Sequence, residues 1–160
     1  MLTDLEIILR LSVSVLLGGL IGFERQYKRR TAGLRTHILV CLGSCLIMLT
    51  SIYVFDIYKS QVPLDPARIA AGIVTGIGFL GAGAIIREHG NGSERVLGLT
   101  TAASLWVVAG IGMAVGCGFK NAAVYSTVLA LVALYFLRYV EGMMLGKEPI
   151  TKHGGESDGI

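Results

Sequence analysis

The chain has 160 residues, of which 53% are apolar and only 16% charged, and its net charge is +3. Soluble proteins average roughly 25% charged residues, so this composition excludes an ordinary soluble domain. The mean hydropathy of +0.68 points the same way, and the sequence predicts an integral membrane protein whose first partner is the lipid bilayer.

Five apolar stretches follow one another along the chain. A spanning helix needs about 20 such residues, because each residue rises ~1.5 Å and the hydrocarbon core is about 30 Å thick. The predicted spans lie near residues 5–23, 37–55, 68–86, 96–116 and 119–138. We therefore expect an all-α, polytopic membrane bundle of about five helices.

The two ends of the chain differ from the spans. The N-terminus is acidic at Asp4 and Glu6, where a secretory signal would carry Lys or Arg, and no small-residue cleavage site follows. We expect the first span to be retained, within a transmembrane domain over residues 1–138. Residues 139–160 form a polar, glycine-rich tail that we expect to be cytoplasmic and flexible.

Basic residues set the expected orientation, because cytoplasmic loops carry an excess of Lys and Arg. Ten of the 14 fall on one side of the predicted spans. These are Arg25, Lys28, Arg29, Arg30, Arg35, Arg87, Arg95, Arg138, Lys147 and Lys152. The sequence predicts an outside N-terminus and a cytoplasmic C-terminus. The basic run Lys28-Arg29-Arg30 directly follows the first span, where it fixes the topology and attracts anionic headgroups. We therefore expect no nucleic-acid partner.

Charged residues at the ends of the spans are candidate functional residues. Glu24 and Arg25 follow the first span and Arg35 and Thr36 open the second, close enough for Glu24 and Arg35 to form an ion pair. At the start of the third span, Asp65 is expected to cap the helix, because Pro66 suits the first helical position. Arg68 lies on the same helical face as Asp65.

Small residues recur along four of the five spans, and the third is the richest in glycine. Its run holds Gly76, Gly78, Gly81 and Gly83. No strand precedes this run and no Lys-Ser or Lys-Thr follows it, which argues against a phosphate-binding loop. Two explanations remain open: close helix packing, or a locally irregular helix of the kind that marks binding sites in transporters.

The fourth span carries hydroxyl groups at Thr100 and Thr101 and an indole at Trp106. A Trp in mid-span needs a partner for its N–H, so we expect Trp106 to face the bundle. Cys41 and Cys45 lie four residues apart and are expected to be small packing residues, not metal ligands. No catalytic arrangement is evident, and we expect neither an enzyme nor a bound cofactor or metal.

Several of these motifs together resemble the MgtC/SapB family of bacterial membrane proteins, and they cover roughly residues 10–140 in order. The matching segments are Gly18–Gln26, Ala32–His37, Asp65–Ala71, Gly76–Gly83 and Gly98–Ala103, with Trp106.

The resemblance implies an inner-membrane protein of about five spans that serves adaptation to stress, including magnesium limitation. It also implies a regulator of other membrane proteins, with the F-type ATP synthase a proposed target. Virulence-type members carry a cytoplasmic domain after the last span, and only about 22 residues follow it here. We therefore expect a short form of the family.

Two functional hypotheses follow. The first is a non-enzymatic protein that acts through helix contacts, with itself or with another membrane protein, and it rests on the small-residue stripes. The second is a small cation transporter or channel related to magnesium, with the glycine-rich third span as its permeation element and Asp65 or Glu24 attracting the cation.

Overall fold

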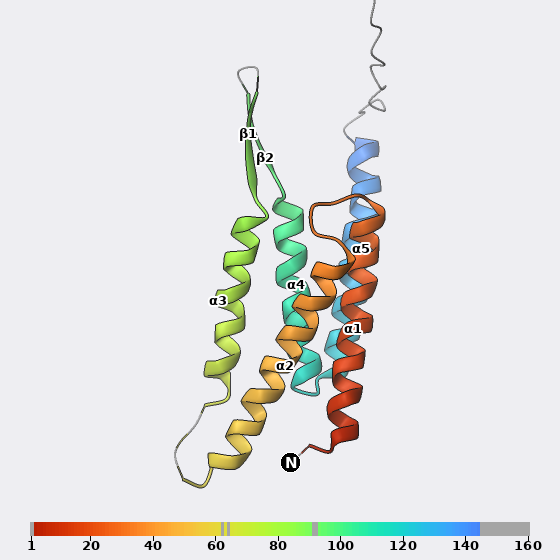
Figure 1. The fold of residues 1–160 in the computed structure, drawn as a ribbon. Coiled ribbons are helices and arrows are strands. Elements are labelled where there is room, and N and C mark those ends of the chain that lie inside the picture. Colours follow the sequence, from red (N-terminus) through yellow and green to blue (C-terminus); the bar gives the residue numbers. More distant parts are fainter. Residues whose placement is uncertain (1, 62, 64, 91–92, 145–160) are drawn as a thin grey trace, which may run out of the picture.

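A computed structural model of the chain describes residues 2–61, 63, 65–90 and 93–144 as a bundle of helices that run alongside one another (Figure 1). In chain order the elements are α1 (Asp4–Tyr27), α2 (Leu34–Tyr58), α3 (Ala67–Gly83), β1 (Ile86–Gly90), β2 (Ser93–Leu97), α4 (Leu99–Gly116) and α5 (Lys120–Met144). The predicted helical bundle is confirmed.

Three of the helices, α1, α2 and α4, are long and apolar enough to cross a membrane. Helix α3 has 17 residues, and the described apolar part of α5 is residues 120–136, so both are shorter than those three helices. The α1–α2 turn, the hairpin and the end of α5 lie at one end of the bundle, as the charge count requires (Figure 1). The orientation in the bilayer stays a prediction. Residues 139–144 of the expected tail belong to α5, and residues 145–160 lie outside the described residues.

A β-hairpin between α3 and α4 was not anticipated. Its strands pair antiparallel, from Ile86 opposite Leu97 to Gly90 opposite Ser93. The third predicted span therefore ends three residues early, at Gly83, and the fourth begins three residues late, at Leu99. In the sequence, Asn91 and Gly92 are the two-residue signal that favours a tight hairpin.

The α1–α2–α4 core depends on close backbone approach at glycines. A Cβ built on Gly18 would lie 2.6 Å from the Cβ of Cys41, and one on Gly112 would lie 2.2 Å from the Cys41 carbonyl oxygen. A Cβ built on Gly116 would likewise lie 2.7 Å from the Cys45 carbonyl oxygen. Cys41 and Cys45 are fully buried in this contact, which confirms their expected packing role.

Three polar side chains connect helices through hydrogen bonds. Arg10 Nη1 donates to the Gly116 carbonyl at 2.6 Å, which joins α1 to the end of α4. His37 lies between α2 and α4, with Nε2 at 3.1 Å from Ser104 Oγ. Ser51 Oγ donates to the Pro66 carbonyl at 2.6 Å and ties α2 to the start of α3.

Candidate functional site: the open face of α3

Helix α3 buries only a narrow stripe of its surface. Of its 17 residues, Ile73, Ile77 and Gly81 are buried. The two isoleucines share a cluster with Leu105 and Ala109 of α4. The stripe repeats every four residues, so it covers a single line along the helix. Of the other residues of α3, all but Ala70 are exposed.

Four glycines of α3 lie outside this stripe. A Cβ built on Gly72, Gly76, Gly78 or Gly83 would meet no atom within 4 Å. Gly81 is the exception, because its Cβ would lie 3.7 Å from the Cβ of Ala102. Of the four glycines predicted as functional residues, one is therefore packed against α4 and three are open.

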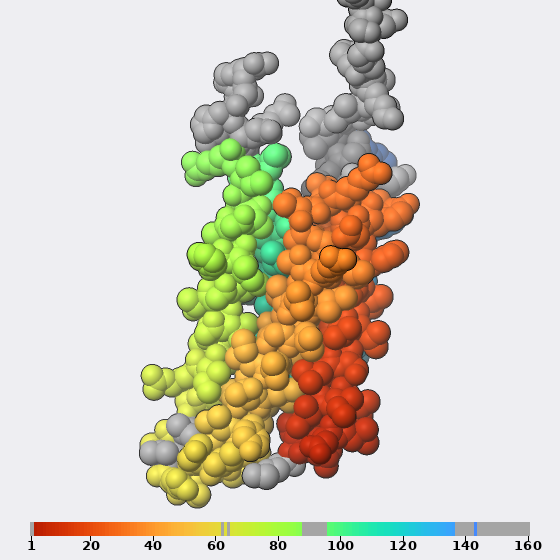
Figure 2. All heavy atoms as spheres, viewed as in Figure 1, coloured from red at the N-terminus to blue at the C-terminus, as the bar shows by residue number. Residues whose placement is uncertain are grey.

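A groove of about 510 Å³ separates α3 from α2. Gly72 and Gly76 lie on its α3 wall, and Gly43 and Ser44 lie on its α2 wall. Figure 2 shows this hollow between the green atoms of α3 and the orange atoms of α2. With glycine on both walls, the groove offers exposed backbone that a further helix could approach closely.

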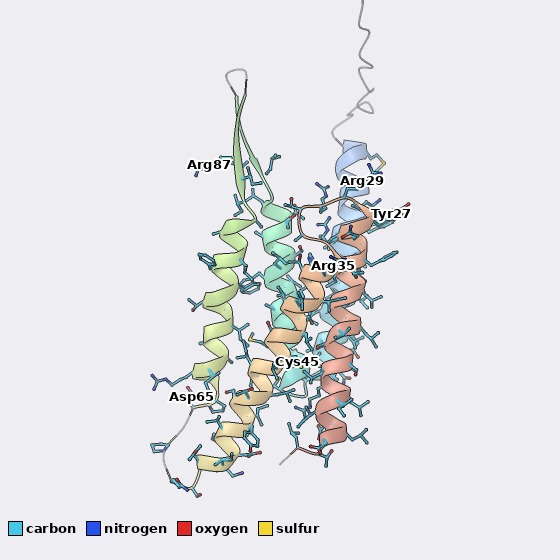
Figure 3. The ribbon with its side chains drawn as sticks, in the orientation of Figure 1. Tyr27, Arg29, Arg35, Cys45, Asp65 and Arg87 are labelled. Atoms are coloured by element: carbon cyan, nitrogen blue, oxygen red, sulfur yellow. The ribbon has the colours of Figure 1, made fainter. Side chains whose placement is uncertain are left out.

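Arg35 and Thr36 line the same groove, so the structure brings these two predicted residues together with Gly76. Arg35 lies near the end of the bundle that carries the α1–α2 turn, and Asp65 lies at the opposite end (Figure 3). The groove is therefore apolar along its length and cationic at one end.

The predicted capping role of Asp65 agrees with the geometry. Its Oδ1 accepts a hydrogen bond from the Ala67 N–H at 2.8 Å, and Pro66 has helical dihedral angles. Asp65 and Arg68 are both exposed, and no ion pair joins them in the described part of the chain. They line a separate cavity of about 290 Å³ with Ser51 and Pro66, at the α2–α3 connection.

The predicted ion pair between Glu24 and Arg35 is wrong. Glu24 instead contacts its neighbour, with Oε2 at 2.9 Å from Arg25 Nε. The reason is geometric: Arg25 is only 2% exposed and points into the bundle, and the Glu24 carboxylate turns toward the Arg25 guanidinium. Arg35 lines the groove on the other side of α2.

The expectation for Trp106 is also wrong. Its side chain is 57% exposed, so it faces away from the bundle. Helix α4 instead buries hydroxyl, small and aliphatic residues, among them Thr101, Gly112 and Val108. Close backbone contact with α2 leaves no room for an indole on that face, and the large side chain takes the uncovered one. Thr100 lies in a second cavity, between α1, α4 and α5.

His37 was missed as a structural residue. It is fully buried, and its Nδ1 lies 2.8 Å from the Gly33 carbonyl oxygen while Nε2 contacts Ser104. Since a carbonyl only accepts, Nδ1 carries a proton. A histidine four residues inside an apolar helix, opposite a helix rich in Ser and Thr, was the available signal.

Within the described residues, no group of three or more His, Cys, Asp or Glu side chains is placed to hold a metal ion.

Comparison with known proteins places the chain in a family. The MgtC family matches residues 11–143. The putative magnesium transporter YhiD of Escherichia coli (strain K12) is 43% identical over 144 residues, which cover 89% of this chain and 65% of that protein. SapB of Bacillus subtilis (strain 168) is 39% identical over 86% of this chain and 59% of its own length.

MgtC of Salmonella typhimurium (strain LT2) is 47% identical over 92% of this chain and 58% of its own length. The chain thus spans about three fifths of the length of the curated relatives it matches. No solved structure matches it. The match over most of the chain and the apolar helices agree with the resemblance drawn from the motifs, and this membrane protein belongs to the MgtC family.

Proposed function

We propose that this protein is a multi-pass, non-enzymatic protein of the bacterial inner membrane that serves adaptation to magnesium limitation or other stress. It acts by contact between the open face of α3 and a membrane-spanning helix of another membrane protein. The link to magnesium rests on the relatives, of which YhiD of Escherichia coli is named a putative magnesium transporter.

The open glycines of α3 carry this proposal. Each glycine in a helix interior costs up to about 1 kcal/mol relative to alanine. At Gly18 and Gly112 a close backbone contact offsets that cost, whereas Gly72 and Gly76 have nothing within 4 Å of an added Cβ. In a bilayer, small residues are what allow two helices to approach closely, so a partner helix supplies the missing contact.

Photo-crosslinking in membranes tests the proposal. A photoreactive residue replaces Phe79, which is 82% exposed on α3. We expect an adduct with another membrane protein, reduced about tenfold by Gly76→Leu, because the added side chain holds the partner helix away. Adducts containing a second copy of this chain would identify self-association instead.

The control is Gly110→Leu, which makes the same change at another open glycine, on α4. It should leave the adduct intact. A change at Ala109 would not serve, because that residue is 2% exposed and a larger side chain there disturbs the core. An adduct that survives Gly76→Leu unchanged would count against contact through α3.

The second candidate, a small cation transporter or channel, is favoured by the name of the YhiD relative. It requires magnesium or another cation to enter liposomes that contain the purified protein. We expect no flux above empty vesicles. Flux that is lost in Asp65→Ala would overturn the contact proposal and establish transport.

A further inference from the structure

A cavity of about 360 Å³ lies between α1, α4 and α5, away from the α3 groove. Ile21, Val107 and Leu134 form apolar walls, and Arg25 and Thr100 are among its polar residues. Helix α1 runs toward the end with the α1–α2 turn and α4 runs away from it. Arg25 is therefore one turn nearer that end than Ile21, and Thr100 is about 10 Å nearer than Val107. The cavity is polar at its outer end and apolar deeper in the bundle.

Two arginines line this cavity. Arg25 is buried at its wall, and Arg30 reaches it from the α1–α2 turn. The turn brings Arg30 back beside Arg25. The Arg30 N–H donates to the Arg25 carbonyl at 3.0 Å, and Arg29 between them has a left-handed φ of 51°. Figure 3 shows Arg29 at this end of the bundle. Among the described residues that line the cavity, none is acidic. Glu24 lies outside this lining and pairs with Arg25, so the two arginines leave one net positive charge at the cavity.

The start of α4 adds to the positive potential. Thr100 is the second residue of that helix, and Gly98 before it offers no side-chain cap. The first N–H groups of a helix have no acceptor within it, and its dipole is positive there. An anion beside Thr100 is thus favoured by backbone donors as well as by the two arginines.

These features fit an amphiphilic anion. Arginine pairs with phosphate oxygens through parallel hydrogen bonds, and basic pockets between membrane helices on the cytoplasmic side bind lipid headgroups. A cavity of about 360 Å³ is large enough for a small ligand. We propose that the cavity binds the phosphate of an anionic phospholipid between Arg25, Arg30 and Thr100, with the start of an acyl chain against the apolar walls.

Native mass spectrometry of the purified protein tests this site, with phosphatidylglycerol titrated against a phosphatidylcholine background. We expect one retained phosphatidylglycerol. Arg30→Gln should weaken its binding about tenfold, because one charge-assisted hydrogen-bonding partner is lost. Arg30 is exposed, so the variant folds.

Arg29→Gln is the matched control. It removes the same charge from the neighbouring residue, which does not line the cavity. The binding should change by less than about twofold, since a solvated charge is screened. Equal losses in the two variants would mean general attraction to the basic turn and would overturn the site.

Two further arms distinguish a lipid from free phosphate. Ala133→Phe fills the apolar part of the cavity and leaves both arginines in place, so it should abolish lipid retention while the melting temperature in detergent stays unchanged. Inorganic phosphate should not displace the lipid at equal concentration. Displacement by phosphate, or full lipid retention in Ala133→Phe, would overturn the lipid assignment.

Discussion

The glycines of α1 and α4 and those of α3 have the same spacing and opposite surroundings. Added Cβ atoms on Gly18, Gly22 and Gly112 would lie within 2.9 Å of a neighbouring helix, whereas those on Gly72 and Gly76 would meet nothing within 4 Å. The first set lets α1, α2 and α4 pack backbone to backbone. The second set contributes nothing to the fold of this chain. A stripe of small residues thus reports that a helix is built to be approached, and only the structure tells whether the approaching helix belongs to the same chain.

The largest expected effect is at Gly112, where the contact between two helices is tightest. In Gly112→Ala the new methyl group would lie 2.2 Å from the Cys41 carbonyl oxygen and 2.9 Å from the Ser44 Cβ, so α2 and α4 must separate. We expect the free energy of unfolding to fall by about 3 kcal/mol, as for an overpacked core. Denaturation by sodium dodecyl sulfate in mixed micelles, followed by circular dichroism, measures it.

Two matched changes sharpen this comparison. Gly110→Ala lies two residues away on the same helix, and Gly76→Ala lies on α3, and neither added Cβ has an atom within 4 Å. Both should leave the stability unchanged or raise it by up to about 1 kcal/mol through helix propensity. If Gly76→Ala is as damaging as Gly112→Ala, then α3 is packed more tightly than its open face implies.

How far the sequence predicts the fold depends on the kind of signal. Helix positions follow from uncharged runs, since the bilayer sets the length, and Asp65 before Pro66 marks the start of α3 correctly. The neighbour of each helix does not follow, because packing in a membrane depends on shape and not on polarity. Trp106 shows this: its N–H predicts an inside position, yet α4 places aliphatic, hydroxyl and small residues inside and the indole outside.

The candidate site was found only in part, for the same reason. The glycine-rich run identified α3, but its open face and the contribution of Gly43 from α2 depend on which stripe packs against α4. The cavity between α1, α4 and α5 was not foreseen, because the turn that returns Arg30 to Arg25 depends on the left-handed Arg29. No residue preference of arginine announces that conformation.

A smaller loss of stability is expected at the polar contact between Arg10 of α1 and the end of α4. Arg10 is 7% exposed, donates to the Gly116 carbonyl at 2.6 Å and pairs with Glu6. Arg10→Met keeps much of the side-chain volume and removes these bonds, so we expect a loss of about 2 kcal/mol in the same unfolding assay.

The control for Arg10 is Arg68→Met. Arg68 is exposed at the start of α3, the helix with the open glycines. Its removal should change the free energy of unfolding by less than about 0.5 kcal/mol. An Arg10→Met protein as stable as the original would show that water or lipid replaces the arginine at the end of α4.

A gain in stability is expected at the turn that follows α1. Helices α1 and α4 finish in the same way, with a left-handed residue after the helix: Arg29 with φ 51° and Gly118 with φ 87°. In both, the next residue donates back across the turn, as Arg30 does to Arg25 at 3.0 Å and Phe119 does to Ala114 at 2.8 Å. Glycine is the usual residue at this position because a Cβ is strained there. Arg29→Gly should therefore raise the free energy of unfolding by about 1 kcal/mol, while Gly118→Ala lowers it by a similar amount. If Arg29→Gly brings no gain in the free energy of unfolding, then Arg29 does not hold the left-handed conformation in the folded protein, and the ordered part of α1 ends at Tyr27.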